Sequence, residues 1–82
     1  MKQHTGIWQT KQLIELGFAR PKSTSSMGQG YQIDAYSIGE LISLLPKNIA
    51  MQREEEKWNV SIGDVSITKA ELIDALFELL TH

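Results

Sequence analysis

The segment from Trp58 to Leu80 constrains the fold most, because its apolar pattern changes from a period of two to a helical period. Apolar and polar residues alternate on both sides of Gly63-Asp64, and glycine allows the positive φ that a two-residue reversal needs. The reversal fixes the pairing, with Ile62 opposite Val65. The segment therefore predicts a hairpin with one apolar face made of Trp58, Val60, Ile62, Val65 and Ile67.

A helix is predicted to follow directly at Thr68. The run Thr68-Lys69-Ala70-Glu71 has the form of a capping box, and Ile67 and Leu72 flank it in the positions of a hydrophobic staple. The helix must be covered on two sides, either by the hairpin and other helices of the same chain or by a second copy, because its apolar arc of roughly 200° is too wide for one neighbour. The arc consists of Leu72, Ile73, Ala75, Leu76, Phe77, Leu79 and Leu80.

A first helix is predicted between residues 5 and 16, with either Thr5 or Thr10 as its N-cap. Its end is marked by Gly17, which suits a left-handed C-cap, and by Phe18, which can fold back on the helix. The predicted apolar face of this helix consists of Leu13, Ile14 and Leu16, with Trp8 as a candidate extension.

A second helix is predicted to begin at Ser37 and to run for about two turns. Ser37-Ile38-Gly39-Glu40 is a second capping box, and Tyr36 precedes it in position to staple onto Leu41. Pro46 ends the helix, because proline disfavours helical backbone angles at the preceding residue and donates no hydrogen bond.

Residues 49–52 alternate in polarity and predict a third strand, antiparallel to residues 58–62 through a charged turn at residues 53–57. A third strand stabilises a hairpin that would be marginal alone. The chain therefore predicts an α+β fold with a single domain over residues 1–82. The order is helix, loop, helix, three-strand antiparallel meander and a C-terminal amphipathic helix, with the helices on one sheet face.

Residues 19–30 are rich in glycine and hydroxyl residues, which predicts a flexible loop. Tyr31, Ile33 and Ala35 then alternate with polar residues, which indicates a short edge strand. The composition favours a solvated linker. The functional interpretation is a site for a phosphate or another small anionic ligand, formed by Arg20, Lys22, Ser23, Ser25 and Ser26.

The composition excludes several classes of chemistry. The chain has 82 residues, no cysteine and a formal net charge of -2, so disulfides, thiolate metal sites and a global attraction to nucleic acid or anionic membranes are not expected. His4 and His82 have no other ligands at metal-binding spacing, which predicts no metal site. No stretch resembles a membrane span or a secretory signal, so we expect a cytoplasmic protein.

No arrangement of residues predicts catalysis or a cofactor. Glu71, Asp74 and Glu78 form one stripe, but a polar arc opposite a wide apolar arc is expected to face solvent. The chain has no phosphate-cradling loop followed by lysine, and its serines are not expected near either histidine. We therefore expect a protein that is not an enzyme. The candidate partner-binding residues are the aromatic side chains of Trp8, Tyr31 and Tyr36, because aromatic residues dominate interface hot spots.

Three segments carry a resemblance, namely residues 10–17, 36–47 and 70–80. With their caps, staples and apolar stripes, they resemble small uncharacterised proteins encoded by bacteriophages and prophages of gut-type bacteria. Similar sequences often continue their last helix beyond the position of His82. The resemblance implies a phage accessory protein, with interference in a host process, such as inhibition of a host defence, as one role.

These observations together predict a small binding module that acts by protein–protein interaction or by ligand sequestration, with a homo-oligomer as a further expectation. The alternative is a small nucleic-acid-associated regulator that places Arg20, Lys22 and neighbouring lysines on phosphates.

Overall fold

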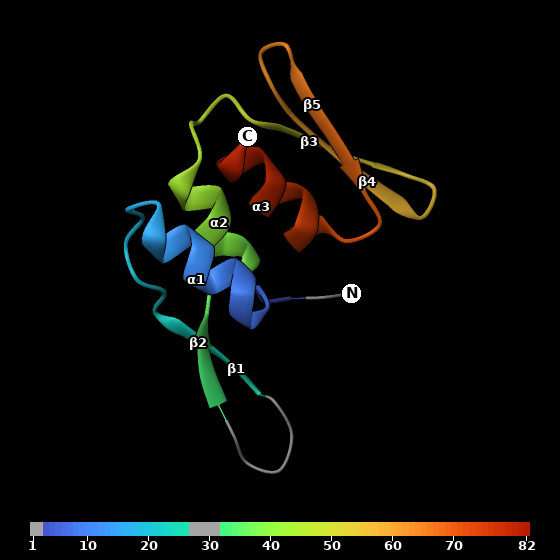
Figure 1. Cartoon of the computed structure of the whole chain (residues 1–82). Helices are drawn as coiled ribbons and strands as arrows, with labels where there is room; N and C mark the ends of the chain where they lie inside the picture. The colour runs from blue at the N-terminus through green and yellow to red at the C-terminus, as the bar shows by residue number, and fades with distance from the viewer. Residues whose placement is uncertain (1–2, 27–31) are drawn as a thin grey trace.

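The computed structural model describes residues 3–26 and 32–82, and it forms three helices and two antiparallel sheets (Figure 1). The α+β class and the predicted order of helices and meander are confirmed. A two-stranded sheet between the first two helices was not predicted. In chain order the elements are α1 (Ile7–Glu15), β1 (Ser23–Ser26), β2 (Gln32–Ala35), α2 (Ile38–Leu44), β3 (Ala50–Glu54), β4 (Lys57–Ile62), β5 (Val65–Lys69) and α3 (Leu72–Thr81).

The three-stranded sheet is a meander in the order β3-β4-β5. Ile62 pairs with Val65 and Val60 with Ile67, so the predicted register is confirmed. Gly63 has a φ of 57°, the positive value that the two-residue turn requires. The turn between β3 and β4 is tighter than predicted, because Glu54 pairs with Lys57 and only two residues lie between them.

Helix α3 is the central layer of the fold. It packs on β4 and β5 with one side and on α2 with the other, and Figure 1 shows it between the meander and α2. Ile73, Leu76 and Val60 are fully buried where these elements meet. The wide apolar arc of this helix is therefore covered by elements of the same chain, which was one of the two predicted arrangements.

The predicted start of α3 is wrong. The helix begins at Leu72 with Glu71 as its N-cap residue, and no side-chain cap is present there. Thr68 belongs to β5 instead, where it pairs with Asn59 and its hydroxyl accepts a 2.8 Å hydrogen bond from the Asn59 amide. The strand continues to Lys69, which pairs with Trp58, so Lys69 is extended and the helical turn that a capping box at Thr68 requires cannot form.

The start of α1 also differs from the prediction, because the N-cap is Gly6 and neither threonine. The Gln9 side chain accepts a 2.9 Å hydrogen bond from the Gly6 amide and so closes the first turn. Thr5 and Thr10 are buried and their hydroxyl oxygens lie 2.7 Å apart. Thr5 also accepts from the Tyr36 amide at 3.0 Å, which fastens the N-terminal segment to the end of β2.

The predicted end of α1 is confirmed. Gly17 has a φ of 98°, its amide donates to Ile14, and the Phe18 amide donates to Leu13. These two hydrogen bonds form a Schellman motif, which satisfies carbonyl groups that the helix leaves unpaired. Phe18 packs against the core as expected.

The predicted flexible loop at residues 19–30 is corrected in part. Residues 23–26 form strand β1, which pairs antiparallel with β2 from Ser23 opposite Ala35 to Ser26 opposite Gln32. The strand at Ile33 and Ala35 is confirmed, whereas Tyr31 and residues 27–30 lie outside the described residues. Serine and threonine side chains give no apolar alternation, so the pairing of β1 leaves no periodic signal in the sequence.

Candidate functional site

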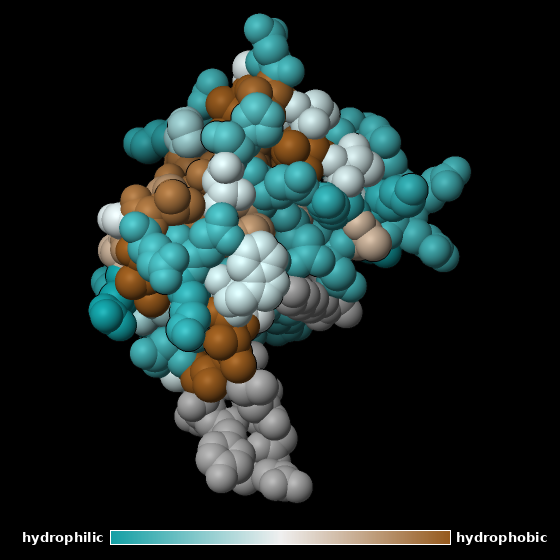
Figure 2. Space-filling view, in the orientation of Figure 1, coloured by the Kyte–Doolittle hydropathy of each residue, from teal (hydrophilic) through white to brown (hydrophobic). Residues whose placement is uncertain are grey.

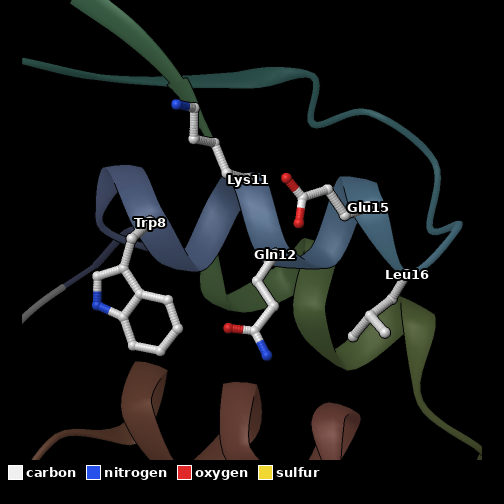
Figure 3. A pocket seen from close by; sticks show the side chains of 5 residues that line it. All are labelled: Trp8, Lys11, Gln12, Glu15 and Leu16. Carbon is white, nitrogen blue, oxygen red and sulfur yellow. The ribbon is translucent and has the colours of Figure 1, made fainter.

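The outer face of α1 carries most of the exposed large apolar side chains in the described part of the chain. Ile7, Trp8 and Leu16 are 47%, 64% and 56% exposed, although a solvent-facing helix surface is normally polar. Trp8, Gln12 and Leu16 are spaced four residues apart and lie on one side of the helix (Figure 3). We define the Trp8 surface as Ile7, Trp8, Lys11, Gln12, Glu15 and Leu16.

The Trp8 surface is held in place by contacts between α1 and α3. The rings of Trp8 and Phe77 meet edge to face, with centroids 5.3 Å apart and an angle of 83° between the planes. One turn before Phe77 on α3, Asp74 accepts a 2.9 Å hydrogen bond from the side-chain amide of Gln9. Gln9 is buried and also caps α1, so a single side chain sets both the start of the helix and its position against α3.

Two hollows flank Trp8. The first has a volume of about 570 Å³ and is lined by Trp8, Lys11, Gln12, Glu15 and Leu16 (Figure 3). The second, which we name the α1–α3 groove, has a volume of about 620 Å³, and Trp8 and Gln12 line it as well. Its other walls include Phe77, Asp74 and an ion pair of 2.9 Å between Lys69 and Glu78. Trp8 and Gln12 therefore line both hollows.

The distribution of hydropathy on the molecular surface fits this placement. Figure 2 shows apolar surface gathered on the side that carries the helices, whereas the part of the same face formed by the meander is mainly hydrophilic. Helix α1, which carries the Trp8 surface, lies on the same side as the other helices (Figure 1).

The predicted anion site is partly assembled, but its donors hold a carboxylate of the same chain. The Lys22 amide donates a 2.7 Å hydrogen bond to Glu40, and the Ser37 amide donates at 3.2 Å. Burial raises the pKa of Glu40, but hydrogen bonds from Lys22, from the Ser23 side chain and from Ser37 together lower this pKa to about 2. Glu40 therefore remains ionised and fills the position that an external anion would take.

The remaining residues of the predicted anion site are more dispersed. Arg20 and Lys22 line a hollow of about 350 Å³ next to Glu40. The backbone of Ser25 and Ser26 lies in β1, paired with β2. Because Glu40 carries a negative charge at this position, the arrangement disfavours a further anion. Ligand binding and phosphate binding at these residues stay predictions.

Tyr36, which was predicted to bind a partner, is buried in the core. Its side chain is buried and its hydroxyl donates to the Ala19 carbonyl oxygen. Burial raises the pKa of this hydroxyl, the charge of Glu40 raises it further, and Arg20 opposes the shift. The ring packs in the hydrophobic core, as expected of a residue that precedes the N-cap of α2 and forms a hydrophobic staple. Tyr31 lies outside the described residues.

The acidic and histidine residues form no metal centre in the described part of the chain. Asp74 is engaged by Gln9 and Glu78 by Lys69, while the backbone of His4 pairs with that of Ser37. Among the side chains that the structure describes, every buried polar atom has a hydrogen-bond partner. No helix in these ranges is both long and apolar enough to cross a lipid bilayer.

Comparison of the chain with protein-family models, with curated protein sequences and with solved structures found no match in any of the three.

The sequence pattern identified only one residue of the Trp8 surface. The sequence pattern predicts that Leu16 and Leu13 share the buried face of α1. Leu13 is buried, but Leu16 is exposed, because the helix ends at Glu15 and the chain changes direction at Gly17. The spacing of Trp8, Gln12 and Leu16 by four residues is the signal that predicts their common face.

Proposed function

We propose that the protein is a non-enzymatic binding module that docks on a protein partner through the Trp8 surface. The observation that carries this proposal is the 64% exposure of Trp8 on a helix that α3 holds rigidly from behind. A pre-positioned aromatic side chain binds at low entropic cost, because little freedom remains to be lost.

The exposed area of Trp8 is large enough to dominate an interface. Aromatic side chains bury 150–250 Å² in cores and interfaces, so covering the exposed part of Trp8 is worth about 2–4 kcal/mol at ~25 cal/mol per Å². Ile7 adds apolar area beside Trp8 at the start of α1, and Leu16 adds it about two turns further on, while Lys11, Gln12 and Glu15 lie between these positions on the helix. Protein interfaces combine such apolar anchors with polar contacts.

The shape of the site favours a large partner over a small ligand. The two hollows beside Trp8 lie at the surface of α1, whereas small-molecule sites enclose most of their ligand. A partner helix or loop that places one apolar side chain in each hollow would contact Trp8 from both. With the resemblance to phage proteins, this supports a phage accessory protein that occupies the surface of a host protein.

The proposal is tested by photo-crosslinking in gut-type bacterial cells. Benzoylphenylalanine replaces Gln12, which lines both hollows, and in a control protein it replaces Lys57, which is exposed on the meander. We expect a discrete crosslinked product from position 12 and none of the same mass from position 57. Adding Trp8→Ser to the position-12 protein should reduce that product roughly 30-fold or more, the factor that corresponds to about 2 kcal/mol.

Trp8→Ser must remain folded for the comparison to hold, because it removes the edge-to-face contact, worth about 0.5–1.5 kcal/mol, in addition to the apolar area that Trp8 buries. Far-ultraviolet circular dichroism checks this directly. An unchanged yield of crosslinked product from the folded Trp8→Ser protein would show that the partner binds elsewhere.

A further inference from the structure

Strand β3 is an unpaired edge of the meander, and all five of its residues are exposed. Helix α3 packs on β4 and β5 and leaves β3 uncovered. Met51 shows the consequence, because it is 43% exposed although it pairs with Val60, which is 0% exposed. The sheet therefore extends by one strand beyond the helix that covers it.

The pairing of β3 determines which of its backbone groups face outward. Glu54 and Lys57 close a two-residue turn and are therefore hydrogen-bonded to each other. Hydrogen-bonded and non-hydrogen-bonded pairs alternate along an antiparallel ladder. Gln52 and Ala50 thus point their backbone groups toward β4, whereas Met51 and Arg53 point theirs away from the sheet. The free edge presents two N–H and two C=O groups in a regular array.

We propose that two copies of the chain associate through antiparallel pairing of their β3 strands into one six-stranded sheet. The strand spans Ala50–Glu54, so all five residues pair only when Gln52 of one copy lies opposite Gln52 of the other. In that register Met51 of each copy lies opposite Arg53 of the other. These are the residues with outward backbone groups, so the two pairs exchange four hydrogen bonds.

The occupant of this edge is a second copy because the strand is complementary to itself. In the Gln52-centred register Arg53 faces Met51 and Glu54 faces Ala50, so no like charges are opposed. A register shifted by two residues would set Arg53 against Arg53. The same register brings the acidic turn of one copy, with Glu55 and Glu56, beside the segment of the other copy that begins at Lys47, and opposite charges meet there.

The pairing also covers part of the exposed face of β3. A two-fold axis perpendicular to the sheet keeps both copies of α3 on the same side. Met51 then packs against the aliphatic stem of Arg53 from the second copy, and the Gln52 amides meet on the opposite face. Five paired residues make a small interface, so dissociation is expected within roughly 1 µM to 1 mM.

The test uses sedimentation equilibrium over this concentration range with a matched pair of variants. Arg53→Pro removes an outward N–H and leaves the ladder to β4 intact, because edge positions of this kind tolerate proline. Arg53→Gln removes the charge but keeps the N–H. We expect the natural protein and Arg53→Gln to dimerise, and Arg53→Pro to dimerise at least 10-fold more weakly. Trp8→Ser should dimerise like the natural protein, which separates this inference from the proposed function.

Amide hydrogen exchange of the unsubstituted protein provides a second measurement if Arg53→Pro does not fold. The Met51 and Arg53 amides should exchange more slowly at high than at low protein concentration, whereas the Gln52 amide should exchange slowly at both. A monomer at 1 mM, an unchanged dimer in folded Arg53→Pro, or Met51 and Arg53 amides insensitive to concentration would each overturn the proposal.

Discussion

The carboxylate of Glu40 is predicted to make the stability of the protein depend on acidity. Three groups donate to it, namely the amides of Lys22 and Ser37 and the side chain of Ser23, and its pKa falls from 4.5 to about 2 in the folded state. A pKa that folding lowers contributes stability above the unfolded value, and that contribution is lost as the pH falls toward the folded value. The relevant window is therefore between about pH 5 and pH 2.

The magnitude follows from the size of the shift. A pKa difference between 4.5 and about 2 corresponds to about 3 kcal/mol, and partial exposure of Glu40 to solvent reduces this to about 1–2 kcal/mol. Glu40→Gln keeps the size of the side chain and the capping oxygen but removes the charge. We expect it to lower the free energy of unfolding by about 1–2 kcal/mol at pH 7.

Urea unfolding at pH 7 and at several values down to pH 2 measures this contribution. The difference between the natural protein and Glu40→Gln should shrink as the pH falls from 5 and nearly vanish at pH 2. Glu56→Gln is the control, because Glu56 is exposed in the β3–β4 turn and its replacement should change stability by less than about 0.5 kcal/mol. A difference for Glu40→Gln that stays constant from pH 7 to pH 2 would refute the reasoning.

Three further predictions concern individual positions and are checked by urea or thermal unfolding. Gly17→Ala should destabilise the protein by about 1 kcal/mol, because residue 17 has a φ of 98°. Gly39→Ala should be neutral or stabilising by up to about 1 kcal/mol, because residue 39 is helical and a Cβ there would meet only the Ser37 hydroxyl, at 4.0 Å. Thr68→Ala should cost less than about 0.5 kcal/mol, since Thr68 is an exposed strand residue; a loss of about 1 kcal/mol or more would point to a helix cap. Tyr36→Phe should lower the free energy of unfolding by about 1 kcal/mol, because the Ala19 carbonyl loses its donor, and an unchanged midpoint would contradict that hydrogen bond.

The elements that could be predicted from the sequence are those whose signals are local. Gly63 fixes the β4–β5 turn and hence the register of the meander, Gly17 fixes the end of α1, and Ser37 with Glu40 fixes the start of α2. In each case a turn or cap residue and its partner lie within a few positions of each other. Such contacts need no knowledge of the rest of the fold.

The features that escaped prediction depend on distant partners. Strand β1 exists because β2 pairs with it, and the start of α3 is delayed because β4 holds Thr68 in the sheet. The role of Gln9 depends on Asp74, which lies 65 positions away. Similarly, Glu40 reaches the Lys22 amide across 18 positions, so the sequence predicted donors for an anion without showing that the anion belongs to the chain.

The contact between Trp8 and Phe77 means that the position of α1 depends on α3, which is synthesised later. Phe77 belongs to the last helix, so a nascent chain that has exposed only its early segments lacks the ring against which the indole rests. The same holds for Asp74, to which Gln9 is anchored. The proposed recognition of a partner through α1 therefore requires that α3 has also been synthesised and folded.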